Sequence, residues 1–311
     1  MKKGRTNYNL ALFLIFINVI ISGGNSPLIK IALREIPSFT FNLLRFVIAF
    51  LFFIPLLIGK KIKFGKSTIG VIFLSLLLTS NIVLFNFGIQ KTTANIGQMI
   101  YAATPIITSI LSYFLLNEKF RSKKILGIII GFMGTLLIIL LPLLEKGSSF
   151  KGDLIGNLLI FIAMIFTAVY FVFSKTFQKE YKPLDITFYF VLVTLISQLP
   201  LAAVEFSSHQ NWWASISKET LFGLLWVGSI GTVGFYFLYQ SIIKHSTPLI
   251  ASMMLYLQPI STFVWAAILL KEGLNTVFII GAILTFIGVW LTTRSEKESE
   301  LAQELSVEEL R

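Results

Sequence analysis

The sequence contains no cysteine and few charges, and each shortage excludes a class of protein. Without cysteine the chain has no disulfide framework, thiol nucleophile or thiolate metal ligand. Only 13% of the 311 residues are charged, about half the share of a soluble globular chain, whereas 55% are hydrophobic and the mean hydropathy is +0.82. The two histidines, His209 and His245, fall in predicted loops, and no G-x-x-x-x-G-K-[ST] phosphate loop is present. We therefore expect neither a soluble fold, a metal site nor an enzyme.

Long apolar runs fill most of the chain. A run of about 20 apolar residues crosses a hydrocarbon core of roughly 30 Å. The pattern predicts an all-α membrane protein with ten transmembrane helices and no large soluble domain. The predicted spans are residues 8–33, 38–58, 68–89, 93–116, 123–143, 153–174, 184–204, 220–243, 247–270 and 274–293.

The net charge of +11 follows from topology and requires no nucleic-acid partner. With the N-terminus in the cytoplasm, cytoplasmic segments hold 18 of the 26 lysines and arginines, and the opposite segments hold 7. This excess is the positive-inside signature. The sequence thus predicts a multi-pass protein of the cytoplasmic membrane with both termini in the cytoplasm.

The chain contains an internal repeat. At an offset of 154 positions, residues 104–137 align with 258–291 without gaps, and 12 of the 34 pairs are identical. Toward the start the offset becomes 145, which pairs Lys30 with Lys175 and Pro55 with Pro200. The predicted units are residues 8–143, residues 153–293 and a polar acidic tail over 294–311. Five spans per unit give the second unit the opposite orientation, and such inverted repeats are typical of transporters with a central cavity.

The motifs also resemble a known family. The first unit has Pro27 and Lys30, then Arg45-Phe46 and Ala49, then Pro105, Leu115-Leu116-Asn117-Glu118, Gly127 and Gly134; the second has Pro259, Leu269-Leu270-Lys271-Glu272, Gly281 and Gly288. In this ordered pairing the chain resembles the EamA-domain transporters, in the ten-helix branch of the drug/metabolite transporter superfamily. The resemblance implies a basket of helices around a central cavity, peripheral fifth and tenth spans, and export of amino acids or other small metabolites. One departure is Ser22-Gly23, where the family often has tryptophan-glycine.

Arg45 is the charge farthest inside a predicted span, about seven residues or roughly 10 Å from its start. An unpaired guanidinium in lipid costs several kcal/mol, so it must face a cavity or a partner. Arg45 is therefore a candidate anchor for a substrate carboxylate, with an interfacial arginine that ties helices together as the alternative. None of the fifteen acidic residues is central in a span, which weakens a carboxylate-driven exchange of cationic drugs.

Neutral polar and aromatic residues form the second set of candidates. Each amide in a span needs hydrogen-bond partners, and most such residues join helices while a minority line the cavity. The break Gly23-Gly24-Asn25-Ser26-Pro27 predicts a kink, because proline removes a backbone donor and frees a carbonyl near Gly23. The candidate substrate contacts beside Arg45 are Asn25, Asn81, Gln98, Tyr101, Tyr236, Tyr256, Gln258 and Trp265. The candidate hinge residues are Gly23, Gly24, Pro27, Pro105 and Pro259.

Together these features predict a secondary transporter that works by alternating access and exports a small neutral, zwitterionic or anionic metabolite such as an amino acid. One alternative is an efflux pump for amphipathic compounds, and another is a membrane sensor or assembly protein that transports nothing. The expected partners are a small-molecule substrate and the lipid bilayer, with no nucleic acid, no cofactor and no metal. The pattern sets no oligomeric state.

Overall fold

The structure is a computed structural model that describes residues 8–116, 122–144, 152–208 and 211–308, and the described part is helical throughout its regular elements. Glu118, in the first copy of the repeated motif, and residues 309–311 of the predicted tail lie outside these ranges. The first half contains α1 (Tyr8–Ser22), α2 (Asn25–Ala32), α3 (Ser38–Leu57), α4 (Thr68–Lys91), α5 (Ala94–Tyr101), α6 (Thr104–Leu116), α7 (Ser122–Ile139) and α8 (Leu141–Leu144). The second half contains α9 (Leu154–Phe177), α10 (Pro183–Ser208), η1 (Trp212–Ser215), α11 (Lys218–Gly228), the π-helix η2 (Ile230–Gly234), α12 (Phe235–His245), α13 (Pro248–Leu270) and α14 (Thr276–Glu308).

The fold turns apolar side chains outward and polar side chains inward, as a lipid solvent requires. Large apolar residues such as Phe16 and Ile268 are 64% and 69% exposed, whereas Asn18, Asn86 and Gln240 are fully buried. Within the described part of the chain, eight helical segments are long and apolar enough to cross a membrane, and residues 124–139 and 276–292 form two shorter apolar helices. The chain is therefore a multi-pass membrane protein.

Three of the membrane-length segments are interrupted. The first breaks at Gly23 and Gly24, between α1 and α2, where the sequence predicts a kink. A second break separates α5 from α6 just before Pro105. The third, between α11 and α12, contains the π-helix η2 and is not predicted by the sequence analysis. By contrast, α13 continues through Pro259 without interruption.

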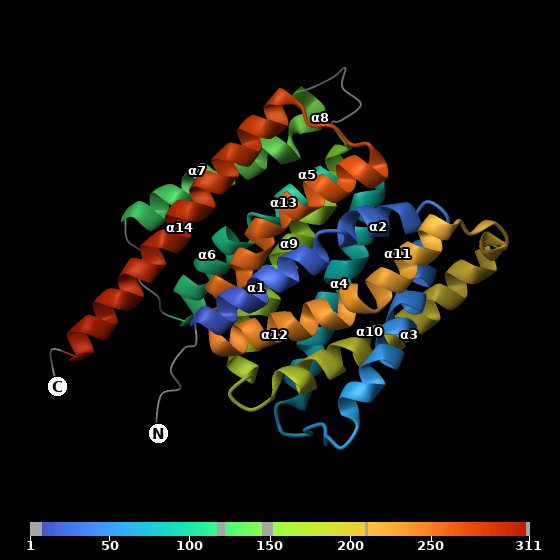
Figure 1. The fold of residues 1–311 in the computed structure, drawn as a ribbon, viewed down its shortest axis with the longest axis horizontal. Coiled ribbons are helices and arrows are strands. Elements are labelled where there is room, and N and C mark those ends of the chain that lie inside the picture. The colour runs from blue at the N-terminus through green and yellow to red at the C-terminus, as the bar shows by residue number, and fades with distance from the viewer. Residues whose placement is uncertain (1–7, 117–121, 145–151, 209–210, 309–311) are drawn as a thin grey trace.

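The two halves of the chain interlock in the bundle (Figure 1). Its main helix pairs each take one member from either half: α4 with α9, α3 with α10, α2 with α11, α1 with α12 and α5 with α13. The pair α7 and α14 lies along one edge of the bundle. Its backbones touch, because a Cβ on Gly288 would fall 2.2 Å from the Cα of Gly131.

Helix α9 begins at the start of the second predicted unit, and α14 extends into the predicted tail. Asp153 precedes α9 and accepts a hydrogen bond at Oδ1 from the backbone N–H of Gly156 at 3.0 Å, so it caps the helix that begins the second predicted unit. At the other end, α14 runs without a break from Thr276 to Glu308. Much of the predicted tail therefore continues the last apolar helix.

Candidate functional site

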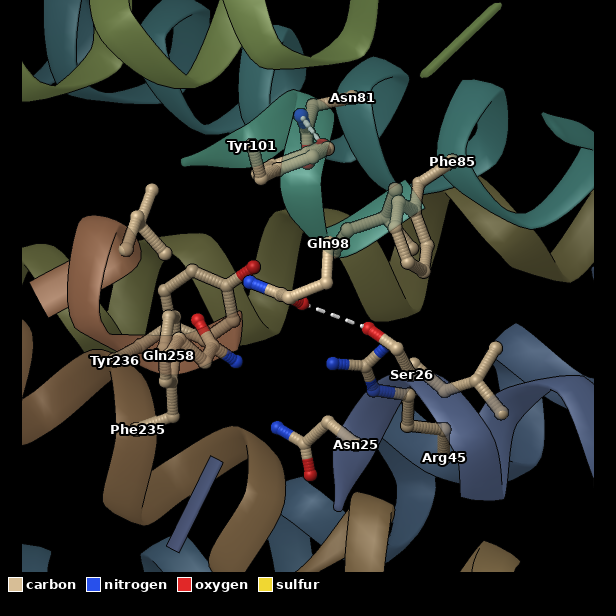
Figure 2. Close-up of a pocket in the computed structure, with 13 residues that line it drawn as sticks. Asn25, Ser26, Arg45, Asn81, Phe85, Gln98, Tyr101, Phe235, Tyr236 and Gln258 are labelled. Carbon is tan, nitrogen blue, oxygen red and sulfur yellow. Dashed lines mark hydrogen bonds between the residues drawn. The ribbon is translucent and has the colours of Figure 1, made fainter. Parts of the chain in front are cut away.

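A cavity of about 80 Å³ lies where the broken helices meet (Figure 2). Its wall takes residues from α2, α3, α4, α5, α12 and α13, so both halves of the chain contribute. Seven of the nine predicted substrate contacts line it: Asn25, Arg45, Asn81, Gln98, Tyr101, Tyr236 and Gln258. The remaining wall residues are Ser26, Ile29, Ile82, Phe85, Phe235 and Leu255.

Arg45 supplies the charge of the cavity. It lies on α3, is 5% exposed, and its Nε donates a hydrogen bond of 2.7 Å to the hydroxyl of Thr232 in η2. Within the described chain no carboxylate pairs with Arg45, and its terminal nitrogens Nη1 and Nη2 make no hydrogen bond. The guanidinium points into the space beside Ser26 and Asn25 (Figure 2). A buried cation thus faces the cavity with its two outer nitrogens available.

The break between α1 and α2 brings backbone and amide groups to the cavity. Asn25 donates from Nδ2 to the carbonyl of Gly231 at 3.0 Å. The two carbonyls at the end of α1 accept from side chains of α13, that of Ser22 from Gln258 and that of Gly23 from Thr262, each at 2.9 Å. The carbonyl of Gly23, which Pro27 leaves without its helical donor, is therefore bound by a side chain of the opposite half.

Gln98 and Asn81 occupy the other side of the cavity (Figure 2). The hydroxyl of Ser26 donates to Gln98 Oε1 at 2.9 Å, which joins α2 to α5. The Asn81 amide donates to the Tyr101 hydroxyl at 2.6 Å and also to the carbonyl of Ala163. Both amides thus have partners that fix their side chains at the cavity wall.

Aromatic rings close the apolar part of the wall. Phe85 packs edge-to-face on Tyr101, with centroids 5.5 Å apart, and Tyr236 packs on Phe190 with centroids 4.4 Å apart. Such contacts hold the rings in place and shield the polar groups from lipid.

Two predicted contacts lie away from this cavity. Tyr256 points toward α14, where its hydroxyl donates to the carbonyl of Phe286 at 3.1 Å. Trp265 lines a separate apolar hollow between α1 and α13, beside Gly24. Residues Leu255 and Gln258 share the cavity-facing side of α13, and Tyr256 lies about 100° around the helix from Leu255.

The sequence pattern does not single out several residues of the site. Ser26 is in the predicted break but is not among the predicted contacts, and Phe85 and Phe235 line the cavity without having been predicted. Thr232 lies outside the wall but bonds to Arg45, and it is not predicted either. The one available signal is the run Gly228-Ser229-Ile230-Gly231-Thr232-Val233-Gly234, whose three glycines and two hydroxyls disfavour a regular helix.

A second polar cluster lies near one end of the bundle, about one turn beyond the cavity. Glu272, 8% exposed at its side chain, pairs with Lys30 at 3.1 Å and accepts from the backbone N–H groups of Ala94 and Asn95 at 2.9 and 3.1 Å. Lys30 also donates to the carbonyl of Thr92 at 2.6 Å. Glu272 of the second half thereby caps α5 of the first half.

No group of three or more histidine, aspartate or glutamate side chains that could hold a metal ion occurs within the ranges that the structure describes. The polar groups of the cavity wall are instead one guanidinium, four amides, two phenols and the hydroxyl of Ser26.

A cavity that both halves of a bundle of membrane-length helices line, with a few polar groups in a largely apolar wall, is the arrangement of a membrane transporter. The chain belongs to the EamA-like transporter family, whose sequence model matches residues 9–140 and 154–294.

Curated relatives extend over nearly the whole chain. The uncharacterized transporter YetK of Bacillus subtilis (strain 168) is 26% identical over 285 residues, covering 90% of this chain and 86% of that protein. An uncharacterized transporter of Archaeoglobus fulgidus is 24% identical over 289 residues, covering 92% of this chain and 98% of its own length. A solved crystal structure with 16% identity superimposes with a TM-score of 0.63 over 93% of this chain and 98% of its own, which shows a shared fold.

Proposed function

We propose that this protein is a secondary transporter that exports small carboxylate-bearing metabolites, amino acids or related solutes, across the cytoplasmic membrane. Arg45 binds the carboxylate, and the amides of Asn25, Asn81, Gln98 and Gln258 with the phenols of Tyr101 and Tyr236 contact the rest of the solute. Alternating access exposes this one site to each side of the membrane in turn.

The proposed transporter has ten transmembrane spans in two inverted repeats, residues 8–143 and 153–293. The pairing of helices supports this arrangement. Helices α4 and α9 form the third and sixth spans, and their equivalents under the repeat are the eighth span, α11 with α12, and the first span, α1 with α2. The contact of α4 with α9 accordingly has a counterpart in the contacts of α12 with α1 and of α11 with α2. The pairs α3 with α10 and α7 with α14 correspond to themselves, as an exchange of the two halves requires.

The buried state of Arg45 is the observation that carries the proposal. A guanidinium that only tied helices together would direct its outer nitrogens to carbonyls or to a carboxylate. Here Nε alone is bound to the described protein, and both outer nitrogens face a cavity. Two parallel N–H groups match the two oxygens of a carboxylate, a geometry that a lysine does not offer.

The size of the cavity favours a small solute over an amphipathic drug. Sites for drug-sized ligands measure about 300 to 1,000 Å³. The cavity of about 80 Å³ is well below that range, and the described residues place no acidic side chain in its wall to bind a cationic drug. Both features support a metabolite transporter over the efflux alternative.

The proposal is tested with purified protein in liposomes that contain a defined mixture of amino acids and small hydroxy acids. We expect faster release of at least one carboxylate-bearing solute than from protein-free liposomes, and a pH gradient shows whether protons are coupled. Arg45→Gln should slow that release at least tenfold, because a hydrogen bond to a charged group contributes about 1.5 to 3 kcal/mol. Arg34→Gln, which removes an exposed arginine outside the cavity, is the matched control. Unchanged release by Arg45→Gln would overturn the carboxylate site.

A further inference from the structure

We propose that Thr232, in the π-helix η2, is a positioning residue that orients Arg45 for binding a carboxylate. This inference rests on the proposed function, since it assigns the anchoring role to Arg45, and it adds a reason for the π-helix. The element lies 187 residues from Arg45 in the sequence and yet holds its side chain.

The hydroxyl of Thr232 has a fixed hydrogen-bond direction. It donates its single hydrogen to the carbonyl of Val227 at 2.6 Å, and its oxygen accepts the Nε–H of Arg45 at 2.7 Å. Thr232 is fully buried, so no water competes for either bond. Because the hydrogen is committed to Val227, the oxygen acts only as an acceptor toward Arg45.

This bond decides which edge of the guanidinium faces the cavity. Arginine has five N–H donors, one on Nε and four on the outer nitrogens. With Nε bound to Thr232, the guanidinium plane is held at its inner edge, and the outer nitrogens point toward Ser26 and Asn25 (Figure 2). The arrangement orients Arg45 before the solute arrives, and such preorganisation lowers the entropic cost of binding.

The π-helix also holds Asn25, the neighbouring wall residue. The carbonyl of Gly231 accepts from Asn25 Nδ2 at 3.0 Å, and a Cβ at position 231 would fall 2.4 Å from Asn25 Oδ1. A widened turn thus presents a carbonyl to Asn25 and, one residue later, a hydroxyl to Arg45. π-helical turns are uncommon and are found frequently at functional sites.

Two substitutions separate the hydroxyl from the shape of the side chain. Thr232→Val keeps the branched shape and removes the hydroxyl, whereas Thr232→Ser keeps the hydroxyl. Thr292→Val is the matched control, because Thr292 is also fully buried and donates to a backbone carbonyl, that of Gly288, but lies on α14 outside the cavity wall.

The bond itself is measured by NMR on protein labelled with [¹⁵N]arginine. The chain has six arginines, and the Arg45 Nε–H signal is assigned by its absence in Arg45→Lys. We expect its hydrogen exchange to be at least tenfold faster in Thr232→Val than in the unmodified protein, and to change less than twofold in Thr232→Ser and Thr292→Val. Equal exchange in Thr232→Val and the unmodified protein would overturn the inference.

Binding is measured on the same signal with acetate, and with acetamide as an uncharged probe of the same size. Acetate should shift the Arg45 signal of the unmodified protein and acetamide should not. Thr232→Val should weaken the affinity for acetate, measured by this shift, at least fivefold. In the liposome assay, adding Thr232→Val to Arg45→Gln should cause no further loss of solute release. If acetate fails to shift Arg45 in the unmodified protein, the proposed function fails; if acetate binds equally in Thr232→Val, only the positioning role fails.

Discussion

At the scale of single residues, the cavity is held together by hydrogen bonds that cross between the halves of the chain. Arg45 bonds to Thr232, Asn25 to Gly231, and Gln258 to Ser22, and in each pair one residue comes from either half. A shift of one half against the other must therefore change these bonds. The solute site and the moving interface of the proposed transporter are built from the same side chains.

Glu35 makes a hydrogen bond between the two halves outside the membrane-spanning segments. Its carboxylate accepts a hydrogen bond of 2.8 Å from the backbone N–H of Ser217, which precedes α11, and this bond lowers the pKa of Glu35 below its ordinary value of 4.5. A group with a lowered folded-state pKa stabilises the protein above its unfolded-state pKa, and the contribution is lost as the pH falls through the folded-state pKa.

We expect Glu35→Gln to destabilise the folded protein by about 1 kcal/mol at pH 7, as for a partly exposed charged hydrogen bond. The difference from the unmodified protein should shrink below about pH 4.5 and vanish once Glu35 is protonated in both states. Thermal unfolding in detergent between pH 3 and pH 7 measures this. Glu219→Gln, which removes an exposed carboxylate from the first turn of the same helix, is the control. A pH-independent difference would contradict the prediction.

At the scale of elements, the Glu272 cluster joins α2, α5 and the end of α13 directly beyond the cavity. Lys30 lies one turn after Ser26 on α2, and Ala94 lies one turn before Gln98 on α5, so the helices that meet at the cavity are joined again at the cluster. With the proposed orientation, this end of the bundle faces outward. The proposed alternating access would open the cavity to the outside at this end, and that opening would separate these groups.

Glu272→Gln should therefore favour the state open to the outside, because the pair with Lys30 is lost and the cap of α5 is weakened. The chain has no cysteine, so Ile29→Cys at the cavity wall is a single reporter. Its labelling by an impermeant maleimide on intact cells should rise at least fivefold in Glu272→Gln. Lys271→Gln, a charge change at the adjacent exposed residue, should leave the rate unaltered. An unchanged rate in Glu272→Gln would show that the cluster does not control opening.

The breaks show which elements the sequence can predict. Gly23, Gly24 and Pro27 give a local signal, since glycine and proline act on the backbone of their own turn. The break in η2 has no proline, and its glycines at 228, 231 and 234 follow a helical spacing that also fits a packing strip. The role of Thr232 depends on Arg45, a partner far away in the sequence, so no local pattern reveals it.

Some of the predicted substrate contacts line the cavity and others do not, and the difference follows from the type of side chain. Residue type and depth identify Arg45, Gln98 and Gln258, because a charged or amide group in a span must face a partner or a cavity. Aromatic side chains carry no such requirement. Tyr256 and Trp265 fit helix packing and the surface of α13 as well as they would fit a cavity, and only the rotation of α13 separates them from Gln258.

At the scale of the whole molecule, the inverted repeat can be tested with two equivalent positions. The offset of 145 that pairs Lys30 with Lys175 also pairs Arg34 with Lys179, and both are exposed. Arg34 precedes α3, whereas the residue after Lys179, Glu180, pairs at 3.7 Å with Lys63 in the loop that follows α3. The two equivalent positions thus lie near opposite ends of one membrane-length helix.

Single cysteines at these positions should consequently label from opposite sides. We expect Arg34→Cys to react with an impermeant maleimide on intact cells, and Lys179→Cys to react only after permeabilisation. Lys60→Cys, exposed in the loop after α3, should behave like Lys179→Cys, and Lys271→Cys, at the end of α13, should behave like Arg34→Cys. The positive-inside excess predicts which of the two positions lies in the cytoplasm, whereas the inverted repeat requires only that the two positions lie on opposite sides of the membrane. Labelling of both from one side would refute the inverted repeat, and with it the exchange of two related halves around Arg45.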